Sequence, residues 1–170
     1  MWKSKLLPNL MLASLLTVTS TAMALDNDRT QPISLEADSA VMDEAKGHYV
    51  YAGNVVVTQG TMTISANSVE IIMNANGDID HFHAVGNDAA QAHLEQITES
   101  DNSKLEAWAD DLLYLVIEDV ITLTGNATLH QHGNQFSGDT INYSVADEKV
   151  KASAKPNTKQ RVKMIFNPGS

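Results

Sequence analysis

Apolar side chains recur at every second position along much of this sequence, and this alternation limits the folds that the chain can adopt. Leu35 follows Ile33 with the polar Ser34 between them, and the same spacing returns in segments across the chain. Those segments are Tyr49-Val50-Tyr51, Val55-Val56-Val57, Met62 to Ala66, Ala90 to Leu94 and Val150 to Ala154. Because successive side chains of a β-strand point to opposite faces, a period of two predicts strands with one face buried and the other exposed to solvent. Such half-buried strands are typical of antiparallel sheets.

Turn-forming residues separate these segments at short intervals. Asn76-Gly77 is the strongest hairpin signal, because both residues tolerate positive φ. The other turn signals are Lys46-Gly47, Gln59-Gly60, Gly133-Asn134 and Asp147-Glu148-Lys149. Many short strands joined this closely predict an all-β sandwich, barrel or jelly roll. Within this pattern we expect residues 105–117 to form a strand buried on both faces, and residues 97–104 to form a polar loop.

The sequence also contains an internal repeat. Gly53-Asn54 opens one alternating segment, Gly125-Asn126 opens another 72 positions later, and a third Gly-Asn pair occurs at Gly86-Asn87. Without a gap, the apolar positions of the first segment then fall on apolar positions of the second. The matches are Val55 with Ala127, Val57 with Leu129, Ile64 with Phe136, Val69 with Ile141 and Ile71 with Tyr143. This preserved register predicts one strand-turn-strand unit that is laid down repeatedly in a stacked or rolled β architecture.

The first 24 residues have the three parts of a secretory signal. Lys3 and Lys5 give a positive start, residues 6–18 form a short apolar stretch, and Ala22-Met23-Ala24 fits the small-x-small cleavage pattern. We therefore predict a cleaved signal peptide at 1–24, a flexible mature N-terminus at 25–32, one β-domain at 33–166 and a short tail at 167–170. The expected compartment is the periplasm.

The charge and the cysteine count narrow the function classes. The chain has a formal net charge of −10 and no cysteine, and removal of the two signal lysines would make it still more acidic. An acidic surface argues against nucleic acid as the partner, because phosphate binding needs a basic one. Thiol chemistry and disulfide bonds are excluded, so the domain must fold by core burial alone.

The residues that could carry catalysis are sparse, and we predict no catalytic residue, no cofactor and no metal site. There is no Gly-x-Ser-x-Gly motif and no glycine-rich phosphate loop. Two His-x-His spacings would place imidazoles on one strand face, but no third and fourth ligand can be recognised beside them. They are His81-Phe82-His83 and His130-Gln131-His132. The acidic pairs Asp110-Asp111 and Glu118-Asp119 are best explained as solvated strand ends.

Basic residues are concentrated near the C-terminus of this acidic chain. They are Lys149, Lys151, Lys155, Lys159, Arg161 and Lys163. Such a stretch has two equally weighted explanations: an edge that contacts a partner or anionic headgroups, or lysines that protect an edge strand from aggregation. We predict a partner edge at Lys149, Lys151, Val162 and Met164.

Several of these segments resemble the OstA-like family of periplasmic lipopolysaccharide-transport proteins, typified by LptA. The similar runs are residues 31–38 (QPISLEAD), 51–60 (YAGNVVVTQG), 64–67 (ISAN), 123–127 (LTGNA) and 137–143 (SGDTINY). The resemblance implies a semi-closed antiparallel β-jelly roll of many short strands, open at both ends. It also implies end-to-end stacking that links an LptC-like inner-membrane partner to an LptD-like outer-membrane partner, with the lipid A acyl chains of lipopolysaccharide inside the roll.

The expected lipid-contacting residues come from two sources. Ile33 and Leu35 match first-strand positions that face the lipid groove in this family. Alternation alone adds Val55, Val57, Met62, Ile64, Val69 and Ile71, and Phe82 is included although residues 73–95 match the family poorly. Two other functions stay open at this stage: a periplasmic structural or envelope-assembly module without lipid cargo, and a polysaccharide-acting or metal-dependent enzyme on a jelly roll.

Overall fold

The structure, a computed structural model, describes residues 28–98 and 102–168. The signal peptide predicted at 1–24 lies outside the described residues. The described residues form a short 3-10 turn and twelve strands. These elements are η1 (Asp28–Thr30), β1 (Ile33–Glu36), β2 (Ser39–Asp43), β3 (His48–Gln59), β4 (Met62–Met73), β5 (Ile79–Val85), β6 (Ala92–Ile97), β7 (Lys104–Ala109), β8 (Asp111–Leu115), β9 (Val120–Gln131), β10 (Asn134–Ser144), β11 (Lys149–Ser153) and β12 (Lys163–Ile165). No helix in the described ranges has the length and hydropathy needed to cross a bilayer.

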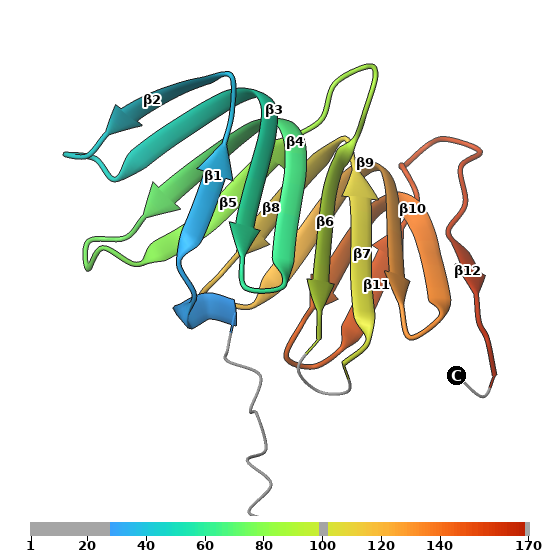
Figure 1. Ribbon diagram of the computed structural model, residues 1–170. Helices are drawn as coiled ribbons and strands as arrows, with labels where there is room; N and C mark the ends of the chain where they lie inside the picture. Colours follow the sequence, from blue (N-terminus) through green and yellow to red (C-terminus); the bar gives the residue numbers. More distant parts are fainter. Residues whose placement is uncertain (1–27, 99–101, 169–170) are drawn as a thin grey trace, which may run out of the picture.

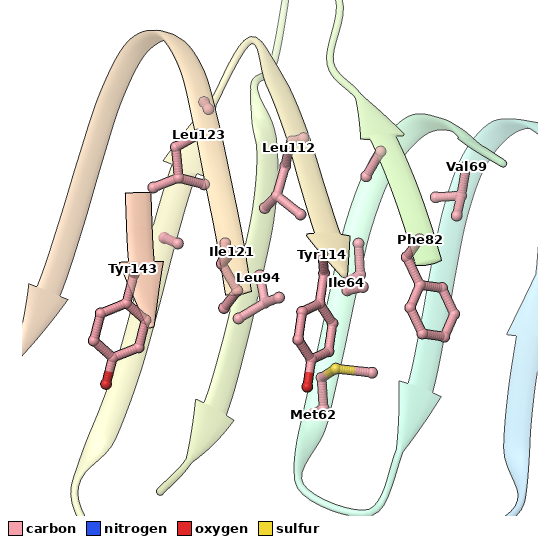
Figure 2. Close-up of a cluster of buried hydrophobic side chains, with 14 of the residues drawn as sticks. Met62, Ile64, Val69, Phe82, Leu94, Leu112, Tyr114, Ile121, Leu123 and Tyr143 are labelled. Carbon is pink, nitrogen blue, oxygen red and sulfur yellow. The ribbon is translucent and has the colours of Figure 1, made fainter. Parts of the chain in front are cut away.

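The strand pairings form two layers of a semi-closed jelly roll (Figure 1). The layer that we name the β6–β7 layer contains β1, β6, β7, β12 and one half of each of the long strands β3, β4, β9 and β10. The β5–β8 layer contains β2, β5, β8, β11 and the other halves of the long strands. Each long strand therefore passes from one layer into the other. The buried apolar side chains lie on the inward faces (Figure 2).

The long strands change layer at the Gly-Asn pairs. Gly53 and Asn54 in β3 have φ of 83° and 47°, and Gly125 and Asn126 in β9 have nearly the same values, 78° and 48°. The pairing of β3 with β4 shifts register at this point. A positive φ is easy for glycine and tolerated by asparagine. These pairs therefore build the corners of the roll.

An aspartate completes each corner. The backbone N–H of Asp38 donates to the carbonyl of Gly53 at 2.9 Å, and its carboxylate accepts a 2.8 Å hydrogen bond from Asn54 Nδ2. Asp110, 72 residues later, makes the same two bonds at 3.0 and 2.8 Å with Gly125 and Asn126. A Cβ on either glycine would collide with the neighbouring carboxylate. The sequence analysis did not single out these aspartates as a pair, although the same offset relates them.

The 72-residue repeat is confirmed in the strand registers. Leu35 pairs with Val57 in the first half, and the equivalent residues Ala107 and Leu129 pair in the second. The turns predicted at residues 46–47, 59–60, 76–77, 133–134 and 147–149 all fall at turns or hairpin ends. The roll therefore contains two copies of one strand arrangement, joined side by side through β5 with β8 and β6 with β7.

The segment 105–117 has a different structure from the one expected. Residues 105–117 do not form a strand buried on both faces: β7 and β8 are separate strands in different layers, and each alternates between buried and partly exposed residues. The prediction was wrong because Asp110 forms a corner in the middle of the apolar stretch. Within the segment predicted as a flexible N-terminus, Asp28 lies in η1 and its carboxylate accepts 2.8 Å and 2.5 Å hydrogen bonds from the backbone and hydroxyl of Thr61.

Candidate functional site

The space between the two layers is lined by apolar side chains from both halves of the chain. Seven of the nine expected lipid-contacting residues are at most 6 % exposed and belong to the core: Val55, Val57, Met62, Ile64, Val69, Ile71 and Phe82. Ile33 and Leu35 are half-buried on β1 and pack against this core. All nine therefore lie on the inward side of the roll, where they contact other apolar side chains.

The sequence analysis missed the second half of this lining. Leu112, Tyr114, Ile121 and Leu123 are equally buried and lie beside the first-half residues (Figure 2). The 72-residue offset had already matched Val55, Val57, Val69 and Ile71 with Ala127, Leu129, Ile141 and Tyr143; these four are also buried, although they were not among the expected lipid contacts. The apolar face thus continues along the whole described roll.

A hollow of about 520 Å³ lies at the side of the roll opposite the Gly-Asn corners, between the β3–β4 turn of one layer and the β4–β5 and β8–β9 turns of the other. Its apolar lining is formed by Ile33, Met73, Ile79, Phe82, Val116 and Ile117. Ile33 and Phe82 were predicted as lipid contacts from distant parts of the sequence, and the hollow brings them together. Phe82 is the member of its lining that belongs to the buried core.

The two ends of the roll expose apolar residues on strands that pair on one side only. At one end β1 and β2 both pair with β3, and Val41 and Met42 are 71 % and 61 % exposed. At the other end β11 and β12 both pair with β10. The predicted partner-edge residues are all here: Lys149 and Lys151 are exposed on β11, Met164 is exposed on β12, and Val162 precedes β12. An open strand edge is a template for pairing with another chain.

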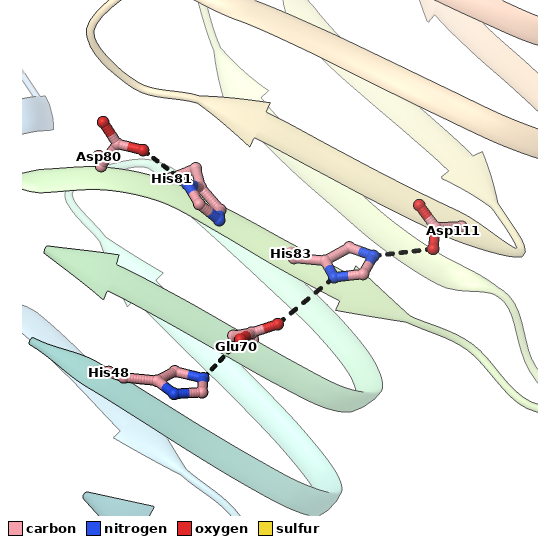
Figure 3. Close-up of polar contacts among 6 residues, drawn as sticks. All are labelled: His48, Glu70, Asp80, His81, His83 and Asp111. Atoms are coloured by element: carbon pink, nitrogen blue, oxygen red, sulfur yellow. Dashed lines mark hydrogen bonds and ion pairs between the residues drawn. The ribbon is translucent and has the colours of Figure 1, made fainter. Parts of the chain in front are cut away.

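Polar residues occupy the outer face of the β5–β8 layer (Figure 3). His83 bonds Asp111 through Nε2 at 2.8 Å and lies 3.7 Å from Glu70 through Nδ1, and Glu70 also contacts His48. His81 points outward as well and bonds Asp80 at 2.7 Å. His81 and His83 thus share one strand face, as their spacing predicts, and each contacts a carboxylate.

The second His-x-His pair has a different geometry. His130 is on the outer face of β9, but β9 ends at Gln131 and His132 lies in the following turn with a φ of 50°. The prediction that both imidazoles share one strand face was therefore wrong, because the strand ends between them. Of the acidic pairs, Asp110 forms a corner, Asp111 bonds His83, and Asp119 accepts a hydrogen bond from Tyr114 at 3.2 Å.

A third polar group lies on the outer face of the β6–β7 layer. Lys104 Nζ is 2.9 Å from Glu95 and 2.8 Å from Glu106, and these bonds lower the pKa of Glu95 and raise the pKa of Lys104. Next to them the ring of His93 stacks on Trp108. Burial lowers the pKa of His93, and the nearby Glu95 and Glu106 act in the opposite direction. The sequence pattern did not predict this group, because its members come from two strands on either side of a loop.

Comparison with known proteins identifies the fold and its family. The family described as "LptA/(LptD N-terminal domain) LPS transport protein" matches residues 34–149. The chain belongs to this LptA family. It is 35 % identical to the lipopolysaccharide export system protein LptH of Pseudomonas aeruginosa over 155 residues, which cover 88 % of this chain and 87 % of LptH.

Other members of the LptA family agree with this assignment. LptA of Escherichia coli K12 is 35 % identical over 151 residues, covering 88 % of this chain and 80 % of that protein, and LptA of Haemophilus influenzae is 33 % identical over 162 residues, covering 94 % and 90 %. The crystal structure of P. aeruginosa LptH, described as the periplasmic component of a conserved lipopolysaccharide transport device, superposes with a TM-score of 0.73 at 32 % identity. That match covers 83 % of this chain and 99 % of LptH. The chain is accordingly a lipopolysaccharide-transport protein, and these relatives are named for export or transport and not for catalysis.

Proposed function

We propose that this protein is exported to the periplasm and carries the lipid A acyl chains of lipopolysaccharide between its two layers. The observation that carries the proposal is the continuous inward apolar face together with the hollow lined in part by Ile33 and Phe82. The signal-like pattern of residues 1–24 and the periplasmic placement of the LptH relative support the compartment.

The energy of acyl-chain hydration explains why such an interior is useful. Exposing acyl carbon to water costs about 0.8 kcal/mol per CH₂, so a chain of a dozen carbons costs on the order of 10 kcal/mol. A lipid with several such chains cannot cross an aqueous gap quickly. An apolar path between two membranes removes this barrier without any chemical step, while the sugars and phosphates stay in water.

The side opposite the corners is the proposed entrance. There the strands of both layers end in turns, and the hollow lies between the Gln59 side of one layer and the Met73–Ile79 side of the other. An acyl chain that enters at this hollow would contact Phe82 and Ile33 first. It would then separate the layers and replace contacts among core side chains, so that buried apolar surface is exchanged and not lost.

We propose that copies of the roll stack end to end. The junction between the two halves supplies the geometry. In the β5–β8 layer, β11 pairs with β10 in the same register as β5 pairs with β4, so β11 is the second-half equivalent of β5. Likewise β2 pairs with β3 as β8 pairs with β9, so β2 is the first-half equivalent of β8. Transferring the register of β5 with β8 puts Val150 opposite Met42, and Lys149 opposite Asp43, of the next copy.

The β6–β7 layer gives a matching result. Here β12 pairs with β10 as β6 pairs with β4, and β1 pairs with β3 as β7 pairs with β9. Therefore β12 is the equivalent of β6, and β1 is the equivalent of β7. Transferring the register of β6 with β7 puts Met164 opposite Leu35, and Lys163 opposite Glu36, of the next copy. In both layers one pair is apolar and faces inward, and the other joins a lysine to a carboxylate. Strand addition at such an edge supplies main-chain hydrogen bonds, and the side chains supply specificity.

The same edges would join the membrane-bound partners. The family description includes the N-terminal domain of LptD as well as LptA, so an LptD-like protein would present a domain of this fold for pairing at one end. The resemblance implies an LptC-like partner at the other end. The basic stretch around Lys149 and Lys163 belongs to the edge on this proposal.

Photo-crosslinking at two adjacent residues tests the lipid-carrying function. Leu35 is half-buried and faces inward, whereas Glu36 is exposed on the same strand. We expect a crosslinking amino acid at Leu35 to capture lipopolysaccharide in cells, and one at Glu36 to capture much less. Equal capture, or none at either position, would contradict the proposal and favour a structural module whose core is filled only by its own side chains.

A further inference from the structure

Two carboxylates lie directly opposite each other on the outer face of the β6–β7 layer. Glu95 on β6 pairs with Glu106 on β7, and His93 and Trp108 are the next outward pair along the same two strands. Like charges at directly opposed positions of a sheet destabilise it unless a cation neutralises them. Lys104 supplies one positive charge between them, at 2.9 and 2.8 Å, for two negative charges.

Imidazole nitrogens lie beside this carboxylate pair. The His93 ring stacks on Trp108 at a centroid distance of 4.7 Å, and Trp108 meets the edge of His130 at 4.9 Å. Nε2 of His93 and Nε2 of His130 are both buried, and neither makes a hydrogen bond to any residue that the structure describes. A buried polar nitrogen without a partner costs free energy and calls for an explanation.

The three side chains converge on one point. One ligand atom from each of His93, Glu95 and Glu106 lies within 4.8 Å of the other two, and in the described ranges no other three His, Cys, Asp or Glu side chains do so. Around a tetrahedral Zn²⁺ ion the ligand atoms lie about 3.3 Å apart, a distance that small carboxylate rotations would reach. An imidazole with two carboxylates favours a transition metal over Ca²⁺ or Mg²⁺, which prefer oxygen alone.

We propose that His93, Glu95 and Glu106 bind a divalent transition-metal ion of the zinc type on the outer face of the roll, where it replaces the ammonium group of Lys104. The two positive charges of the ion neutralise both carboxylates, whereas the single charge of the lysine neutralises one. This site is on the side of the sheet opposite the apolar interior, so it is independent of the proposed lipid path.

Calorimetric titration with Zn²⁺ tests the site. The full chain is expressed for this experiment, and the protein is purified without a metal-binding tag. We expect one equivalent to bind to the wild type. Lys104→Met removes the competing cation and should tighten binding about fivefold, because one nearby charge is worth about 1 kcal/mol even at high dielectric. His93→Gln and Glu106→Gln should each weaken binding more than about tenfold, as expected when a metal ligand is lost.

His83→Gln is the matched control. It removes a partly buried histidine from the outer face of the other layer, where His83 bonds Asp111, and it should leave Zn²⁺ binding unchanged. Loss of binding in His83→Gln, or unchanged affinity in Lys104→Met, would overturn the proposal, as would absence of binding to the wild type. The Lys104→Met result does not depend on how well His93→Gln folds, because it predicts a gain of affinity.

Discussion

The two halves of this protein build the same corner but place it in different surroundings. Asp38 with Gly53 and Asn54 repeats the bonds of Asp110 with Gly125 and Asn126 almost atom for atom. The strands that follow the two aspartates have different neighbours: β8 lies between β5 and β9, whereas among the described residues β2 pairs only with β3.

Burial shows the consequence of that difference. Tyr114 on β8 is 4 % exposed and stacks on Phe82, while Met42, the equivalent residue on β2, is 61 % exposed. The local sequence therefore determines the strand, and the neighbouring strand determines whether its inward side chain is buried. The first half has the shape of a unit whose neighbour is absent, and this supports the proposal that another chain fills that place.

The largest expected contrast is in the stability of alanine variants at these equivalent positions. Tyr114→Ala removes a buried ring and should lower the free energy of unfolding by about 3–5 kcal/mol. Met42→Ala should change it by less than about 0.5 kcal/mol, because the side chain is exposed in the single chain. Urea unfolding at low protein concentration measures both. Similar losses in the two variants would show that the halves are not distinguished by their neighbours.

The corner aspartates should show a smaller contrast. The Asp110 carboxylate accepts hydrogen bonds from Gln91 and Asn126, whereas Asp38 accepts one from Asn54. We expect Asp110→Ala to cost about 2 kcal/mol and Asp38→Ala about 1 kcal/mol, since each of these exposed bonds contributes of the order of 1 kcal/mol.

The double variant Gln91→Ala with Asp110→Ala identifies the source of that difference. Gln91 Nε2 also donates to the Asn126 carbonyl at 3.2 Å, so the double variant should cost more than Asp110→Ala alone, but about 1 kcal/mol less than the sum of the two single variants, because these share the bond between Gln91 and Asp110. If Asp38→Ala is as costly as Asp110→Ala, the extra bond to Gln91 contributes nothing measurable to the internal corner.

Much of this comparison was accessible from the sequence. Alternation located the inward residues of β3, β4 and β11, and the Gly-Asn offset located both halves and their register. The corner at Asp110 was missed because residues 105–117 are almost continuously apolar around it, and an apolar run alone does not reveal a change of layer. The offset from Asp38 contained the missing information.

The outer clusters could not be predicted for a different reason. His93, Glu95 and Glu106 share a face only because β6 and β7 pair with Glu95 opposite Glu106. Glu70 and His83 meet through the register of β4 with β5 in the same way. A sequence gives the spacing within a strand, but the register between strands follows from turn and corner geometry.

The smallest expected effect concerns charge at the proposed junction between copies. The internal junction pairs His93 with Trp108, and the equivalent pair between copies is Lys163 with Glu36. Lys163→Glu would put two carboxylates opposite each other and should weaken self-association about fivefold, or about 1 kcal/mol, because an exposed pair contributes little. Sedimentation at several protein concentrations measures the change.

A charge exchange separates this contact from a general effect of charge. Glu36→Lys combined with Lys163→Glu restores opposite charges and should recover most of the lost affinity, whereas Lys155→Glu, in the same basic stretch but outside β11 and β12, should have little effect. Recovery requires that the two residues face each other across the junction, since reversing distant charges produces no such coupling. If the exchanged variant associates as weakly as Lys163→Glu alone, the end-to-end register copied from the internal junction is wrong, even though the two halves within one chain follow it.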